Sequence, residues 1–238
     1  MLKVLVACEE SQAVCKAFRD LGHEAYSCDL QECSGGHPEW HVKGSVIPIL
    51  GGGVTLQTED RKQHTIPGLW DLIIAHPPCT YLTITGNRWF KDEYGTSAVG
   101  RYYDRMDAIR FFMTIALCSA KHMAIENPVG IMSSVYRKPD QIIQPWWFDE
   151  DGTEETEKGT CLWLKNLPQL TPRNVIKPDI KYHEMKSGKR QTEWYYQTRC
   201  LPHEERAKAA SKTFKGIAGA MAEQWSRYIE KEEATCEI

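Results

Sequence analysis

The chain lacks an excess of charge of either sign: 29 Lys and Arg residues stand against 32 Asp and Glu residues, a formal net charge of −3. Without a general positive field, any binding to nucleic acid requires local basic patches. Hydrophobic residues make up 42% and charged residues 26% of the 238 residues, a composition typical of globular proteins. A chain of this length can bury a full core, so we expect one domain over residues 1–238.

Long apolar runs are also missing. The hydrophobic start of the chain meets Glu9-Glu10 before it reaches the length of a signal peptide's apolar region or of a membrane span. Nine cysteines are present, but their number is odd and their spacing is irregular, so no disulfide framework is indicated. We therefore expect a cytoplasmic protein with reduced cysteines and no membrane contact.

A metal site is not expected. Cys28, Cys33, His37 and His41 imitate the spacing of zinc ligands, but their spacings fit no common zinc module. Cys28 is also expected to lie on a strand, which does not suit a zinc-binding loop. The prediction is therefore that the chain holds no metal.

Strand and helix patterns alternate over the first thirty residues. An apolar run at 3–8 is followed by a helical pattern that ends at Gly22, and a second apolar run at 23–28 is closed by Asp29. This order predicts a parallel sheet. The glycine-rich loop that usually follows the first strand of a nucleotide-binding unit is absent. Asp29 either accepts hydrogen bonds from a ribose or caps the next segment.

A rigidly presented cysteine follows the most apolar strand pattern. Leu72 to Ala75 form a short apolar run, which favours a buried strand. Pro77 and Pro78 cannot continue a sheet ladder, so Cys79 is expected on a stiff loop just past the strand's carboxyl end. Two interpretations remain open, a nucleophile or a buried structural thiol.

A carboxyl group is predicted to lie near that cysteine. Residues 122–125 form another apolar strand that ends in Glu126-Asn127-Pro128, and residues 104–121 between the two strands have a helical pattern. Consecutive parallel strands joined by a helix are usually neighbours, so their tips should bring Cys79 and Glu126 to one edge of the sheet. Glu126 is then a candidate general acid, with a surface acid or a cap as the alternative.

Two segments mix basic and aromatic residues. Residues 80–103 are predicted to be a long loop that acts as a lid or a binding loop, with a solvated loop as the alternative. Residues 171–200 carry seven Lys or Arg against three Asp or Glu, which fits either a small nucleic-acid surface or a charged excursion. Elsewhere, residues 46–50 and 54–57 are predicted to be short strands around a triple glycine, and residues 204–231 one helix.

These motifs resemble those of the DNA cytosine-5 methyltransferases. The likeness lies in Pro-Pro-Cys at 77–79 and Glu-Asn-Pro at 126–128, each after an apolar strand. The chain is more similar to the short cytosine-methyltransferase-like proteins of bacteriophages and prophages, which it resembles at 4–9, 27–30, 70–82, 160–164 and 211–218. This resemblance implies a Rossmann-like S-adenosylmethionine-dependent methyltransferase fold with a mostly parallel α/β sheet. From its composition, the chain is expected to form a loop-rich basic and aromatic excursion at about 131–203. The resemblance further implies a C-terminal helix that completes the cofactor pocket.

The resemblance implies roles for individual residues. The activity it implies is methyl transfer from S-adenosyl-L-methionine to carbon 5 of cytosine in DNA through a covalent intermediate. The catalytic residues would be Cys79, Glu126, Asn127 and Pro78. The cofactor would contact Cys8, Glu9, Ser11, Asp29, Leu30, Ser45, Pro77, Ser211 and Thr213. From their basic and aromatic character, we expect the DNA substrate to contact Arg88, Trp89, Tyr102, Lys186, Lys189 and Arg190.

The chain departs from the larger enzymes of that family in several places. Glu9-Glu10-Ser11-Gln12 replaces the glycine-rich cofactor loop, and Gly44-Ser45 stands where those enzymes carry a Gly-Asp pair. Their Gln-x-Arg-x-Arg motif and a sizeable target-recognition domain are absent, with Lys158 or Lys165 approximating the motif. Two alternatives follow: an enzyme that methylates free cytidine nucleotides, and a non-catalytic phage protein that binds DNA or a host factor on the same fold.

Overall fold

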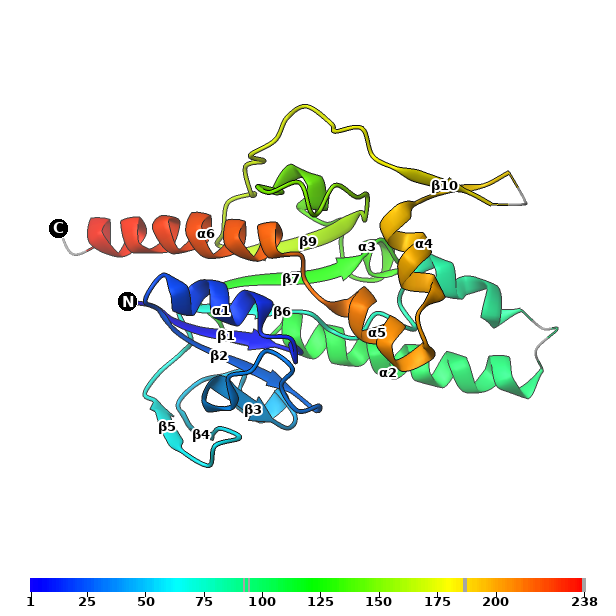
Figure 1. Ribbon diagram of the computed structural model, residues 1–238. Helices are drawn as coiled ribbons and strands as arrows, with labels where there is room; N and C mark the ends of the chain where they lie inside the picture. Colours follow the sequence, from blue (N-terminus) through cyan, green and yellow to red (C-terminus); the bar gives the residue numbers. More distant parts are fainter. Residues whose placement is uncertain (92, 94, 186–187, 237–238) are drawn as a thin grey trace.

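The central element is a seven-stranded, mostly parallel sheet, described from a computed structural model that covers residues 1–91, 93, 95–185 and 188–236. The strand order is β3-β2-β1-β6-β7-β9-β8, in which all neighbours are parallel except β9, which runs antiparallel to β7 and β8 (Figure 1). The strands are β1 (Lys3–Ala7), β2 (Glu24–Asp29), β3 (His41–Lys43), β6 (Leu72–Ala75), β7 (His122–Pro128), β8 (Gln141–Ile143) and β9 (Thr160–Lys165). The predicted Rossmann-like α/β fold is confirmed.

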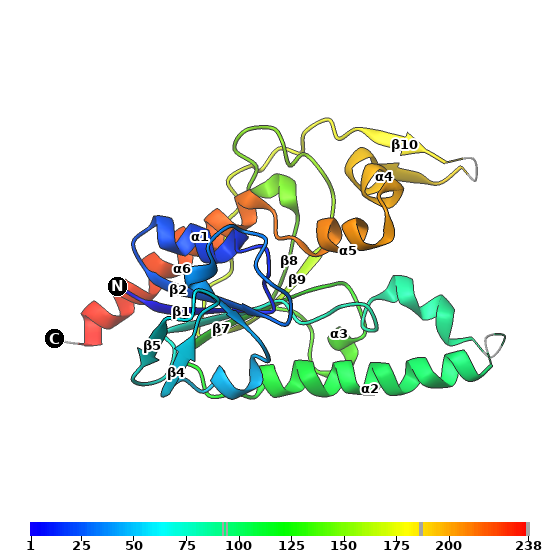
Figure 2. The same ribbon diagram turned by 60° about the horizontal axis from the view of Figure 1, so that its bottom comes forward.

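Helices cover both faces of the sheet because side chains alternate along each strand. Val4, Val6 and Ile74 face a core formed with α1 (Ala13–Asp20) and α6 (Lys215–Cys236). Leu5 and Ile73 face a second core that includes part of α2 (Thr96–Ala116). Figures 1 and 2 show α1 and α6 side by side on one face of the sheet and α2 on the other. None of the helices in the described residues has the length and apolar composition needed to span a bilayer.

The predicted strand at 46–50 is wrong. Residues Ile47–Ile49 form a 3-10 helix, η2, with Pro48 near its start, where the missing backbone N–H costs no ladder bond. The buried Trp70 holds this turn because its indole N–H donates to the carbonyl of Ile49 at 2.7 Å. The strand predicted at 54–57 is confirmed as β4 (Val54–Gln57), but its partner is β5 (Gln63–Ile66), so the hairpin does not turn at the triple glycine.

The segment 80–103 is not one long loop. It contains the 3-10 helix η3 (Ile84–Phe90) and the beginning of α2, which starts at Thr96 instead of the predicted 104 and ends at Ala116 instead of 121. The guanidinium of Arg105 lies 3.5 Å from the centre of the Phe90 ring, and its Nε donates to the carbonyl of Tyr81 at 2.9 Å. These contacts hold the segment against α2, so it does not extend into solvent as a loop.

The predicted helix at 204–231 is two helices, α5 (His203–Ser211) and α6. The break falls at residues 212–214 because the Glu154 carboxylate accepts hydrogen bonds from the backbone N–H groups of Lys215, at 2.5 Å, and Gly216, at 2.8 Å, and so caps a new helix.

Residues 131–203 include β8 and β9 of the central sheet. The same segment holds α3 (Met132–Val135), the 3-10 helix η5 (Pro145–Trp147), the hairpin β10 (Tyr182–Glu184) and β11 (Arg190–Thr192), and α4 (Glu193–Cys200). The 3-10 helix η1 (Pro38–Trp40) lies before β3.

Candidate active site at the tips of β6 and β7

The loop that carries Cys79 leaves the sheet directly after β6. The backbone N–H of His76 makes the last bond to the neighbouring strand, donating to the carbonyl of Ala7 at 2.9 Å. Pro77 is buried, Pro78 is exposed and Cys79 is half-buried. The carbonyl of Cys79 accepts hydrogen bonds from the N–H groups of Leu82 and Thr83 at 2.9 and 3.1 Å. The cysteine therefore sits in a turn fixed at both ends, as the two prolines predict.

The strand β7 ties this loop down at two places. Ala75 pairs with Ile125, so His76 lies beside Glu126, and Pro77 beside Asn127. The buried Asn127 donates from Nδ2 to the carbonyl of Pro77 at 2.7 Å. Farther along, the backbone of Gly130 approaches the carbonyl of Leu82 so closely that an added Cβ would lie 2.1 Å from its oxygen. The expectation that β6 and β7 are neighbours with both motifs at one edge is confirmed.

Glu126 does not face the solvent but pairs with a histidine that the sequence analysis missed. His76 Nδ1 lies 3.1 Å from Glu126 Oε2, and the two side chains are only 7% and 16% exposed. Burial alone lowers the pKa of His76, but the hydrogen bond and charge of Glu126, with the charge of Glu9, outweigh burial and raise it. Burial works to raise the pKa of Glu126, but the bond and charge of His76, with the charge of Lys158, lower it. The contact therefore favours the charged form of each side chain.

The Cys79 thiol is protonated at rest. Burial and then the charge of Glu126 raise the pKa of Cys79, while the charge of Lys158 opposes both. Lys158 lies before β9 and is oriented by its own contacts: Nζ donates to the carbonyl of Ala210 at 2.8 Å and lies 5.6 Å from the centre of the Phe214 ring. Lys158 is thus the nearby group that favours a thiolate.

These electrostatic influences predict a specific pattern of alkylation. With iodoacetamide at pH 7.5, Cys79 should react more slowly than the exposed Cys200, and its rate should still rise above pH 9, because only the thiolate reacts. Glu126→Gln should speed the reaction of Cys79, and Lys158→Met should slow it, each on the order of tenfold. Peptide mass spectrometry gives the rate at each cysteine, with Cys200 as the internal control. Equal rates in the three proteins would contradict this account of the thiol.

In the loop after β1, the Glu9 side chain binds backbone N–H groups that a glycine-rich loop would leave free for a ligand. Cys8 has a left-handed backbone (φ 60°) and turns the chain out of the sheet. The buried Glu9 then accepts hydrogen bonds from the N–H groups of Val14, at 2.6 Å, and Cys15, at 3.1 Å, in the first turn of α1. Both carboxylate oxygens of Glu9 are therefore engaged with the helix, and its contact with a cofactor stays a prediction.

Asp29, Leu30 and Ser45 gather beyond the ends of β2 and β3. Asp29 Oδ1 accepts a hydrogen bond from the N–H of Gln31 at 2.9 Å, which is a local turn contact. Burial and then the charge of Asp29 raise the pKa of Cys8. Leu30 is 75% exposed and Ser45 is exposed. Both remain accessible for the contacts that the resemblance implies.

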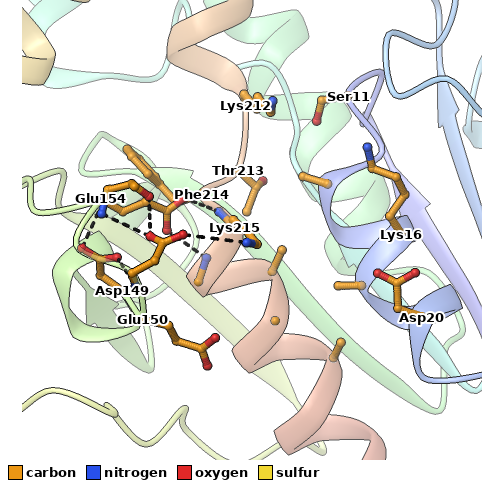
Figure 3. Close-up of a pocket in the computed structure, with 18 of the residues that line it drawn as sticks. Ser11, Lys16, Asp20, Asp149, Glu150, Glu154, Lys212, Thr213, Phe214 and Lys215 are labelled. Carbon is orange, nitrogen blue, oxygen red and sulfur yellow. Dashed lines mark hydrogen bonds and ion pairs between the residues drawn. The ribbon is translucent and has the colours of Figure 1, made fainter.

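A second group of predicted cofactor residues lines a cavity of about 810 Å³ between α1 and α6. Figure 3 shows Ser11 and Lys16 on the α1 side, facing Thr213 and Lys215 at the start of α6, with Glu154 beside them. Six acids and four bases line this cavity: Asp20, Asp149, Glu150, Asp151, Glu154 and Glu223, and Lys16, Arg173, Lys212 and Lys215. Ser211 is exposed at the end of α5, and neither Cys79 nor Asp29 reaches the cavity. The predicted cofactor residues therefore fall into two groups.

The predicted DNA-binding residues lie on two projecting elements. Arg88 stacks over the Trp89 ring on η3 at 4.7 Å, and Tyr102 on α2 is 52% exposed. Lys189 and Arg190 are exposed on the β10–β11 hairpin, and Lys186 lies outside the described residues. Figures 1 and 2 both show the hairpin and the η3–α2 end extending from the same end of the molecule, the end at which β7 finishes. Two separate surfaces thus flank the tips of the strands.

No metal cluster stands beside these residues: within the part of the chain that the structure describes, no three His, Cys, Asp or Glu side chains form a group able to hold an ion. His76 is the site residue that sequence reasoning missed, and Lys158 was named there only as one of two lysines that approximate an absent motif. The position of His76 directly before Pro-Pro-Cys was the only available signal, since no local pattern shows which side chain a buried histidine pairs with.

No family model matches the chain, and no curated protein sequence matches it. Among solved structures, it is similar to a chain from E. coli named "putative DNA modification methyltransferase encoded within prophage", at 13% identity and a TM-score of 0.42. The similarity covers 83% of this chain and 64% of that one, so this chain spans less than two thirds of the length of its neighbour. A match at this level assigns no activity to this chain.

Proposed function

We propose that this chain transfers a methyl group to carbon 5 of cytosine in DNA, with Cys79 as the nucleophile and Glu126 as the general acid. The observation that carries the proposal is the junction of the two strand tips, where the Asn127 amide holds the Pro77 carbonyl at 2.7 Å and Glu126 lies beside the cysteine loop. Two residues that need each other chemically are thereby brought together from positions about fifty residues apart in the sequence.

The chemistry needs both groups. Carbon 5 of cytosine is a poor nucleophile until a thiolate adds to carbon 6, and Cys79 is placed on a rigid turn for that addition. Protonation of ring nitrogen 3 by Glu126 offsets the charge that develops and leaves an enamine with a nucleophilic carbon 5. Loss of the carbon-5 proton after methylation expels Cys79. In duplex DNA, the base must first leave the stack.

The methyl donor would be S-adenosyl-L-methionine, which supplies an electrophilic methyl group on a sulfonium. A cavity of about 810 Å³ is large enough for such a cofactor, and its excess of two acids suits a ligand with a net positive charge. Ser11 and Thr213 line this cavity and would contact a donor bound there. Asp29 and Leu30 lie outside it, at the end of β2, where the resemblance would place the nucleoside instead. Glu9, which already caps α1, would exclude an anionic group from that helix end.

The substrate is tested by comparing methyl transfer to duplex DNA, single-stranded DNA and deoxycytidine monophosphate at low salt. We expect transfer to DNA, because two separate basic and aromatic surfaces flank the site and a free nucleotide needs only one small pocket. Replacing Lys189 and Arg190 by Ala should reduce the slope of log affinity against log salt by about 1.8 for duplex DNA, since each phosphate contact contributes about 0.9.

The matched control replaces Arg227 and Lys231 by Ala. Both residues are exposed on α6, and the end of this helix lies opposite the hairpin in Figure 1. The control removes the same two positive charges as the hairpin variant, but it should leave the salt slope unchanged. Methylation of the monophosphate alone would overturn the DNA proposal and favour the nucleotide enzyme. Binding of DNA without any methyl transfer would favour a non-catalytic protein, for which the engaged Glu9 carboxylate is the supporting observation.

A further inference from the structure

His76 is buried beside the reacting groups, and within the described residues only one of its two ring nitrogens has a hydrogen-bond partner. Its Nδ1 lies 3.1 Å from Glu126 Oε2. Its Nε2 is buried and has no hydrogen-bond partner in the described part of the chain. A buried polar atom without a partner costs free energy, so a side chain of this kind is expected to do something that compensates for the cost.

The groups around His76 favour a positive ring. Glu126 approaches from β7, Glu9 from the loop after β1, and Lys158 from the segment before β9. Two carboxylates against one lysine raise the pKa of His76 in spite of its burial. Cys79 belongs to the same loop and is protonated, so it adds no charge. His76 therefore keeps its proton to a higher pH than an ordinary histidine does.

The proposed reaction has a need that Glu126 alone cannot meet. A general acid must hold a proton, but the partners of Glu126 lower its pKa and keep it ionised. A carboxylate only accepts hydrogen bonds and cannot protonate ring nitrogen 3. The proton has to reach Glu126 from a group in contact with it, and His76 is hydrogen-bonded to one of its oxygens.

We propose that His76 is the proton source for Glu126, so that the two residues act as one general acid; this inference rests on the proposed function. The Cys79 thiol first loses its proton to solvent, which gives the reacting thiolate. The N–H bond at His76 Nδ1 then breaks as an O–H bond forms on Glu126, and the acid gives that proton to nitrogen 3 while Cys79 sulfur bonds to carbon 6. The positive ring becomes neutral, the carboxylate returns to its charged form, and the negative thiolate is consumed. The net charge of the site is unchanged by the step.

The unpartnered Nε2 assists this transfer. An acceptor on Nε2 would stabilise the imidazolium and hold the proton on the ring, as a carboxylate does for the histidine of a catalytic triad. Without that acceptor, the charged ring is less favourable in its buried site, and its proton is easier to deliver. The orphaned nitrogen is thus consistent with a proton donor and not with a permanent ion pair.

The test compares wild type with His76→Asn, which keeps an N–H donor near Glu126 but holds no transferable proton. In single-turnover methyl transfer to DNA, the variant should be slower by about 10²- to 10³-fold, within the range for general acid catalysis, with unchanged DNA affinity. The thiolate fraction of Cys79 rises with pH below its raised pKa, so the rate of a protein that needs only the thiolate should rise steadily. The wild-type rate should instead level off above the pKa of His76, because the proton of His76 is present below that pKa and lost above it. The variant should lack this levelling and keep rising.

His122→Asn is the matched control. His122 is a second buried histidine, at the other end of β7, with its Nε2 at 2.9 Å from Glu232 Oε2. This change should lower stability by a similar amount but leave the pH profile as in wild type. An equal loss of rate at every pH in His76→Asn, with the wild-type levelling of the rate retained, would show a structural role and overturn the proposal.

A measurement that does not depend on activity examines the proton itself. Ring ¹⁵N shifts should show His76 protonated at pH 7 in wild type and neutral in Glu126→Gln; a neutral ring in wild type would overturn the proposal. A wild type that methylates normally, together with a fully active His76→Asn, contradicts the role of His76 alone. A wild type that methylates none of the three substrates overturns the proposed function and the role of His76 with it.

Discussion

Cys79→Ala should abolish methyl transfer, with a loss of at least about 10⁴-fold, while the melting temperature stays close to that of wild type. The loss is large because no other group in the turn can form the bond to carbon 6, and removing a nucleophile typically removes several orders of magnitude of rate. The fold should tolerate the change because Cys79 is half-buried and its backbone carbonyl, not its thiol, makes the bonds that fix the turn. Transfer of a labelled methyl group and thermal unfolding measure the two effects.

A mechanism-based trap identifies the bond directly. Duplex DNA that contains 5-fluorocytosine should remain covalently attached to wild type, since the carbon-5 fluorine cannot leave as a proton does, and peptide mapping should place the adduct on Cys79. Cys200→Ala is the control, because Cys200 is an exposed cysteine at the end of α4, outside the two strands that carry Cys79 and Glu126. Activity retained in Cys79→Ala, or an adduct on Cys161, would show that the nucleophile has been assigned wrongly.

Gly130→Ala should disable the site from a distance. The added Cβ would lie 2.1 Å from the carbonyl oxygen and 2.9 Å from the carbonyl carbon of Leu82, so two backbone segments would have to separate. We expect a loss of about 1–3 kcal/mol in the free energy of unfolding, the usual cost of overpacking. The rate of methyl transfer should fall by more than the loss of stability alone would cause, because the same contact anchors the segment that follows Cys79. The Leu82 carbonyl in that segment accepts a hydrogen bond from the N–H of Ile131 at 2.9 Å.

Gly100→Ala is the matched control for this prediction. Gly100 is exposed in α2, and an added Cβ there meets no atom within 4 Å. The change should increase the free energy of unfolding by up to about 1 kcal/mol through helix propensity and leave activity intact. Chemical denaturation and single-turnover rates of both variants give the comparison. A fully stable and active Gly130→Ala protein would mean that the contact at Leu82 does not hold the loop.

The sequence patterns were enough to predict where the two main motifs of the site lie. Apolar runs before Pro77 and Glu126, with a helical pattern between them, were sufficient to place both motifs at the ends of neighbouring parallel strands. This worked because strand and helix periodicity is a local property of the chain, and because parallel connections obey a narrow set of rules. The same local patterns found the first strand–helix–strand unit.

The hydrogen-bond partners and the charges of the site's side chains depend on tertiary contacts that the sequence patterns do not predict. The contact of His76 with Glu126 follows from the register of two strands, and Lys158 approaches from a segment that the sequence places on neither strand. The carboxylates of Glu9 and Glu154 cap α1 and α6, and Arg105 folds residues 84–90 onto α2, which sequence patterns had left as a loop. A polar side chain carries no periodic signal for its partner. Its partner, and therefore its protonation state, depends on which distant segments the core packs beside it.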